Sequence, residues 1–142
     1  MISNKVIQAD MVAWLKTQGT LTTLLAGGTS DEVREEQYQG TVFGYPAVRL
    51  AVLNQAPITE REHCDHARLT VTVRCYAEGA SSRPVDILAG VVNDLLHRKQ
   101  FRGTGWYTTF YSSGLVGAVR LNEKLWRSEA MFTGVVYPTT TP

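Results

Sequence analysis

The N-terminal part of the sequence carries apolar residues at helical spacing. Ser3 is a suitable N-cap for a helix over residues 4–17, because its hydroxyl can accept a hydrogen bond from the first turn. The apolar positions on one face of this helix are Ile7, Met11, Trp14 and Leu15. A shorter turn over residues 21–25 follows and is stopped by Gly27-Gly28. We expect a helical arm that needs another surface to bury Trp14.

Alternating apolar and polar residues predict two strands in the middle of the chain. The first covers residues 47–53, and the second, which has the strongest alternation, covers residues 66–77. The apolar positions on one face of the second strand are Leu69, Val71, Val73 and Cys75. Residues 54–65 between the strands are mostly polar. A connection of this length predicts a long exposed hairpin, and such loops are often functional.

A second amphipathic helix is predicted over residues 82–97. Ser81-Ser82 can cap it, and Pro84 falls in its first turn, where proline is tolerated. Its apolar stripe consists of Leu88, Val91, Val92, Leu95 and Leu96. Because this stripe is long and continuous, we expect this helix to be the main element packed across the sheet.

The C-terminal third reads as a strand, a looser segment and a final strand. Residues 106–111 are aromatic and rich in threonine, which favours a strand. Residues 112–124 include two glycines and a turn-like Asn122-Glu123-Lys124, and are expected to be irregular. The final strand, residues 125–137, is apolar on both faces. A strand of that kind must be covered twice, and we expect another subunit to supply the second cover.

These elements predict an α+β fold. Strands interrupted by a single helix favour an antiparallel sheet of about four to five strands, with two to three helices packed on one side and a long protruding β-hairpin. The acidic segment 31–37 is consistent with either a short edge strand or a loop. The 142 residues fit one domain over residues 1–137, followed by a flexible tail at residues 138–142.

Composition narrows the classes of function. The 14 basic and 13 acidic residues give a net charge of +1, which argues against a dedicated nucleic-acid-binding protein. There is no apolar run of about 18 residues and no signal peptide, so we expect neither a membrane span nor export. Two cysteines about 35 Å apart on an extended chain cannot form a disulfide, which fits a reducing compartment.

One cluster carries the residue types of metal or thiol chemistry. His63, Cys64, Asp65 and His66 are consecutive, but neighbours on an extended chain point to opposite faces. Zinc ligands are normally spaced two to four residues apart, and a second ligand pair is missing. A small metal-binding module or hydrolase that uses His63, Cys64 and His66 is the alternative from another class. A bacterial ligand-binding or toxin–antitoxin-type domain is a further alternative.

Basic and aromatic residues mix at the end of the second helix. The residues that could stack nucleic-acid bases there are Arg98, Lys99, Phe101, Arg102, Trp106 and Tyr107. A helix end that complements the helix dipole, followed by an aromatic strand, explains the same residues. We favour this second interpretation.

The order of segments resembles the tail-terminator and tail-completion proteins of long-tailed bacteriophages, a group that includes tail-to-head joining proteins. The resemblance covers about residues 7–137 and is one of pattern. The matching segments are the helix that ends in LTTLLAG (21–27), the strand entry GYPAVRL (44–50), the strand ARLTVTVRCY (67–76), the helix that ends in LLH (95–97) and the strand end FTGVVY (132–137).

The resemblance implies a structural virion protein and not an enzyme. Such subunits close into a ring, typically of six copies, at the head-proximal end of the tail tube. The implied partners are copies of the same chain, the tail tube protein and a head–tail connector or neck protein. DNA would pass through the lumen without specific binding, and no cofactor or metal is implied. The location would be the virion tail, after assembly in the host cytoplasm. A neck, connector or tube subunit of the same tail is the closest alternative.

Exposure selects two groups of candidate interface residues. The charged hairpin should reach a neighbouring ring or subunit through Glu60, Arg61, Glu62, His63 and Asp65. The acidic segment should line the lumen or meet basic residues of the next copy through Asp31, Glu32, Glu35 and Glu36. A solvated loop is the alternative interpretation of both groups.

Overall fold

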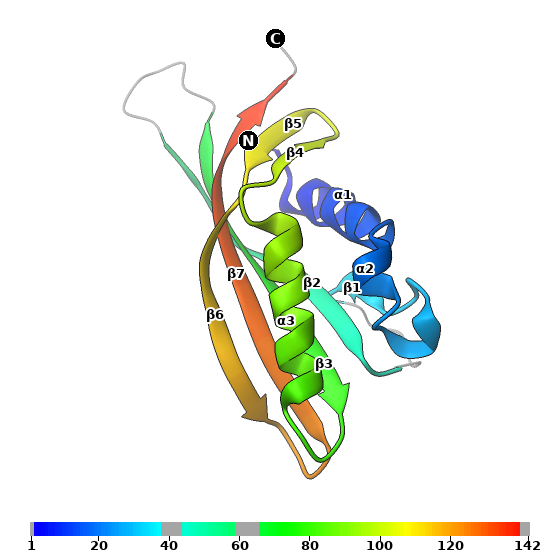
Figure 1. Ribbon diagram of the computed structural model, residues 1–142. Helices are drawn as coiled ribbons and strands as arrows, with labels where there is room; N and C mark the ends of the chain where they lie inside the picture. Colours follow the sequence, from blue (N-terminus) through cyan, green and yellow to red (C-terminus); the bar gives the residue numbers. More distant parts are fainter. Residues whose placement is uncertain (1, 38–43, 59–65, 140–142) are drawn as a thin grey trace.

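The computed structural model describes residues 2–37, 44–58 and 66–139 (Figure 1). In this part of the chain, the helices are α1 (Asn4–Lys16), α2 (Gly19–Thr22), the 3₁₀ turn η1 (Ala26–Gly28) and α3 (Arg83–Leu96). The strands are β1 (Val33–Glu35), β2 (Ala47–Pro57), β3 (Ala67–Glu78), β4 (Gln100–Gly103), β5 (Trp106–Thr109), β6 (Tyr111–Arg120) and β7 (Leu125–Pro138).

The strands form a curled sheet in the order β1-β2-β3-β7-β5-β4, and β6 also pairs with β7. Strand β1 runs parallel to β2, and the other pairs are antiparallel. Strands β5 and β6 follow one another along the same edge of β7, with Tyr107 opposite Tyr137 and Tyr111 opposite Thr133. Between them the chain turns aside, and the Phe110 amide donates to the Lys99 carbonyl.

The N-terminal helix forms as predicted and finds its cover within the chain. The Ser3 hydroxyl accepts a hydrogen bond from the Lys5 amide at 3.2 Å, which caps α1. The side chains of Ile7, Met11 and Leu15 are fully buried. Trp14 is half-buried and packs edge-on against Phe101, with 5.8 Å between ring centroids. The expected partner surface for Trp14 is therefore supplied by the same molecule.

Helix α3 is the main packing element on the sheet, as predicted. Its first turn contains Pro84, and the Ser81 hydroxyl accepts a hydrogen bond from the Arg83 amide at 3.1 Å. The helix contacts β3, β7 and β6, and its Leu88, Val92 and Leu96 are buried. All the helices lie on one side of the sheet (Figure 1). The α+β class with helices packed on one side is thus confirmed.

The segment expected to be irregular is a strand, so that prediction was wrong. Strand β6 spans ten residues along β7. Its glycines do not prevent pairing, because the register shifts between Ser112 and Gly114, and Gly114 there adopts a φ of 152°. The described residues contain seven strands, more than the four to five expected. Besides β6, the difference comes from the short strands β1, β4 and β5, and β1 shows that the acidic segment contains an edge strand.

Candidate assembly interface

The face of the sheet beneath the helices is dry. On β3, the alternating side chains of Leu69, Val71, Val73 and Cys75 are all fully buried. The corresponding positions of β7, Ala130 and Phe132, are also fully buried. Burial of each large aliphatic or aromatic side chain stabilises the fold by about 1.5–3 kcal/mol before conformational entropy is counted. This face therefore supplies the core and leaves no free surface for a partner.

Strand β6 is the opposite case, because it lies at an edge and has no neighbour beyond it among the described strands. Its side chains are exposed along almost its whole length. The exposed apolar residues of β6 and of the turn that follows are Tyr111, Leu115, Val116, Val119 and Leu121, which are 42–53% exposed. We call these five residues the β6 patch. An apolar edge strand of this length is a site at which another polypeptide can associate.

The face of the sheet away from the helices carries charged side chains in pairs. Arg74 contacts Glu129 at 3.0 Å and Glu36 at 3.3 Å. Arg127 lies 3.7 Å from the same Glu129. Burial acts to lower the pKa of Arg74, but the hydrogen bond from its guanidinium to Glu129 and the charge of Glu36 outweigh burial and raise it. The charges on this face thus stabilise one another within the chain.

Glu32 of the acidic segment is buried, with only 4% of its surface exposed. Its carboxylate forms an ion pair with Arg49 at 3.3 Å, and the Arg49 guanidinium also donates to the Glu32 carbonyl at 2.7 Å. Glu36 is held by Arg74, as described above. The two other acidic residues expected at an interface lie nearer the surface: Asp31 is exposed and Glu35 is half-buried.

The hairpin that was expected to protrude is built from β2 and β3. Beyond the strands, the Ile58 amide donates to the His66 carbonyl, so pairing continues one step further. Residues 59–65 lie outside the described part of the chain. The hairpin residues proposed at an interface, namely Glu60, Arg61, Glu62, His63 and Asp65, all belong to that segment.

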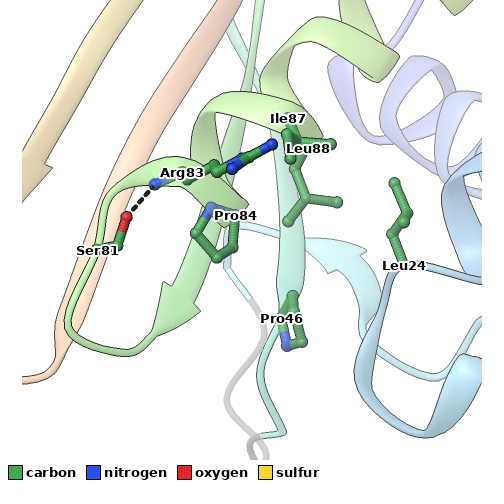
Figure 2. A pocket seen from close by; sticks show the side chains of 7 residues that line it. All are labelled: Leu24, Pro46, Ser81, Arg83, Pro84, Ile87 and Leu88. Atoms are coloured by element: carbon green, nitrogen blue, oxygen red, sulfur yellow. Dashed lines mark hydrogen bonds between the residues drawn. The ribbon is translucent and has the colours of Figure 1, made fainter.

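An apolar pocket of about 390 Å³ lies between α3 and the segment that follows α2 (Figure 2). Leu24, Pro46, Pro84, Ile87 and Leu88 line it, with Ser81 and Arg83 at one side. Leu24 is 39% exposed and Ile87 is 47% exposed, whereas Leu88 is buried. The pocket thus has a buried apolar floor and partly exposed apolar walls. Such a surface suits an apolar side chain better than a charged ligand.

The residue types for chemistry do not gather in the described residues. No group of three or more His, Cys, Asp or Glu that could hold a metal ion occurs there. His66 is exposed and packs against Tyr137, while His63 and Cys64 fall outside the described ranges. Cys75 is a buried free thiol, and burial raises its pKa to about 12, so it is a poor nucleophile at neutral pH.

The basic and aromatic residues considered for base stacking are divided between core and surface. Phe101 and Trp106 are buried and stack on each other, with ring centroids 5.2 Å apart. Tyr107 is exposed, stacks on Tyr137 at 5.1 Å and lies beneath the Arg102 guanidinium. This distribution favours the structural interpretation of the aromatic segment. None of the helices in the described residues has the length and apolar character needed to cross a membrane.

The sequence analysis missed the β6 patch and the pocket. A usable signal was present in β6, since Leu115, Val116 and Val119 are good strand formers despite the glycines between them. Ile87 also gave a signal, because this large apolar residue falls outside the buried stripe of α3. Apolar residues that do not fit the predicted core face are candidates for contacts with another molecule.

The architecture defines an α+β protein with helices on one side of a curled sheet. No protein-family model and no curated protein matches this chain. A solved structure, described as the virion of a native gene transfer agent (GTA) particle, contains a chain with the same fold. The TM-score is 0.76 at 16% sequence identity, and the match covers 93% of this chain and 95% of that chain. At this identity the likeness shows the fold alone.

Proposed function

We propose that this chain is a structural protein of a virion and that it works by assembling with copies of itself. The observation that carries the proposal is the β6 patch, an apolar edge strand that one copy leaves open to solvent. Monomeric proteins rarely keep a contiguous apolar surface of this kind unless it binds something. The fold shared with a chain of a gene transfer agent virion over nearly the full length of both supports the same conclusion.

The specific role we propose is that of a tail terminator. Copies of the chain form a ring, six in the form that the resemblance implies, at the head-proximal end of a tail tube. The ring ends tube polymerisation and presents a surface to the head–tail connector or neck protein. A head-to-tail contact between identical subunits produces such a ring when the rotation between them closes. The near-neutral net charge suits a channel that DNA must pass without being held.

In this role the protein acts through surfaces and performs no catalysis. We propose that the hairpin residues Glu60, Arg61, Glu62, His63 and Asp65 reach a neighbouring subunit or ring. Of the acidic segment, Asp31 and Glu35 are the carboxylates available to a neighbour or to the lumen. Glu32 and Glu36 already pair with arginines of their own chain.

Negative-stain microscopy of the purified protein tests the proposal. We expect discrete closed rings that do not grow with protein concentration. Long cylinders would instead indicate a tube subunit, and single unassociated particles would contradict the proposal. A variant with Glu60→Lys, Arg61→Glu and Glu62→Lys should keep its far-UV circular dichroism spectrum but lose the rings. Preparations of that variant that still form normal rings would remove the hairpin from the interface.

A further inference from the structure

We propose that the pocket between α2 and α3 receives the β6 patch of the next copy of this chain. The inference rests on the proposed ring and names the contact that builds it. It assigns an occupant to the 390 Å³ apolar pocket and a binding partner to β6 in a single head-to-tail interface. The remaining paragraphs give the geometry, the charges and the experiment.

The two surfaces lie on different sides of the molecule. Strand β6 contacts one flank of α3, and α2 contacts the helix as well and lies on the other flank (Figure 1). A patch and a pocket on one molecule cannot meet each other, but each can meet the counterpart on a neighbour. Two different complementary surfaces are what a heterologous contact requires, whereas a two-fold dimer would need a surface that matches itself.

The shape of β6 favours docking by side chains over the addition of a strand. Its register against β7 shifts twice, between Ser112 and Gly114 and again between Val116 and Val119. Such irregularities interrupt an edge and hinder pairing of its backbone with another strand. The side chains remain available: Leu115 is 53% exposed and lies on the helix-bearing side, opposite Ala130 of β7. An aliphatic side chain in this position can enter a pocket on a neighbouring molecule.

The walls of the pocket match an aliphatic ligand. Figure 2 shows Leu24 and Ile87 on either side of an opening above Pro46 and Pro84. Leu24 and Ile87 are themselves among the exposed large apolar residues of the chain. Insertion of β6 side chains would therefore cover apolar surface on both copies at once. A small polar ligand would leave these walls wet and would gain little.

Charges beside the two surfaces are complementary. Asp31 and Glu35 lie at the β1 edge, in the segment that follows η1. Arg120 and Lys124 lie exposed where β6 ends, with Glu123 between them as the one acidic residue of that turn. The basic end of β6 in one copy would then face the acidic β1 edge of the next. This pattern favours a second copy of the chain over an unrelated apolar peptide as the occupant.

Crosslinking of paired cysteines tests the contact. In a Cys64→Ser background, one sample combines Leu115→Cys and Ile87→Cys chains, and the matched control combines Leu53→Cys and Ile87→Cys chains. Leu53 is a suitable control because it is 48% exposed on β2, outside both surfaces. The remaining Cys75 is fully buried and its pKa is raised, so it should not react. A short bismaleimide is added, and the products are separated on a denaturing gel.

The expected result is loss of the monomer band to dimers in the Leu115/Ile87 mixture, with no such loss in the control mixture or in either single variant alone. A chain carrying both Leu115→Cys and Ile87→Cys should give a ladder that ends at the ring. Rings visible by microscopy without crosslinking of Leu115 to Ile87 would overturn this contact and leave the proposed function standing. Crosslinking of Leu115→Cys chains to each other would also overturn it. Absence of any assembly would overturn both proposals.

Discussion

Strands β3 and β6 flank the same strand, β7, yet they have opposite surroundings. Both contain several aliphatic residues, and both pair with β7 over much of its length. In β3, Leu69, Val71 and Val73 are fully buried, whereas in β6 Leu115 and Val119 are 53% and 45% exposed. Strand β3 has β2 on its other side, and α3 crosses it. Strand β6 has a free edge, and α3 reaches it only at its flank.

The comparison shows that the number of neighbours, and not the apolar content, decides how much of a strand is buried. Full burial of one large apolar side chain gives about 1.5–3 kcal/mol. The five residues of the β6 patch therefore leave several kcal/mol of possible stabilisation unused in a single copy. A partner that covers β6 would recover part of it. On this account β3 stabilises the monomer, and β6 stabilises the assembly.

The largest effect is expected from charges placed in the β6 patch. The double variant Leu115→Asp, Val119→Asp should lose assembly completely, because it would bring unpaired carboxylates into an apolar contact. Its unfolding midpoint, measured in urea on unassembled protein, should shift little, since both sites are exposed in one copy. Gel filtration reports the assembly. Unchanged assembly, or collapse of the monomer fold, would show that β6 has been assigned the wrong role.

A core truncation should do the reverse. Phe132 is fully buried on β7, between β3 and β6, on the side covered by the helices. Phe132→Ala should lower the free energy of unfolding by about 3–5 kcal/mol, through lost burial and the cavity left behind. The matched variant Leu115→Ala should change it by less than about 0.5 kcal/mol in the unassembled chain. Chemical denaturation measures both. Equal losses at the two positions would remove the distinction between them.

A smaller loss should follow from breaking the buried ion pair on β2. Arg49→Leu leaves the Glu32 carboxylate buried without its closest guanidinium and should cost about 3 kcal/mol in unfolding free energy. The double variant Glu32→Leu, Arg49→Leu removes both charges and should recover much of that loss. Thermal denaturation of both variants tests this. A double variant as unstable as the single one would contradict the argument.

The smallest effect concerns the contact between α1 and the turn joining β4 to β5. The Asp10 carboxylate accepts hydrogen bonds from the Thr104 amide at 2.8 Å, the Thr104 hydroxyl at 3.0 Å and the Trp106 indole at 2.7 Å. Burial acts to raise the pKa of Asp10, but these hydrogen bonds outweigh it and lower the pKa below its usual value. We expect Asp10→Asn to cost about 1–2 kcal/mol at pH 7.

The sign of the pH dependence follows from the lowered pKa. The ionised Asp10 stabilises the fold above the pKa of an unfolded aspartate, about 3.9, and this contribution disappears as pH falls through the lower folded-state pKa. The stability difference between the wild type and Asp10→Asn should therefore shrink between pH 4 and pH 2. Urea denaturation over this range measures it. A difference that stays constant would show that the charge of Asp10 is unimportant.

The helices and the covered strands could be predicted from the sequence because their signals are local. Ser3 capped α1 as expected, and the alternation in β3 gave its buried face correctly. Strand β6 could not be found in this way, because its glycines imitate a loop and its partner β7 follows only after a turn. The pocket was also out of reach, since Leu24 and Ile87 lie far apart in the sequence and only the fold brings them together.

The mass of the purified chain in solution tests the central claim most directly. Light scattering coupled to gel filtration should give one species at micromolar concentration, with a mass that is a fixed multiple of one chain and does not rise further as concentration increases. Such a species would mean that the copies cover each other's open strands and that the assembly closes. A particle with the mass of a single chain at the same concentration would contradict the account.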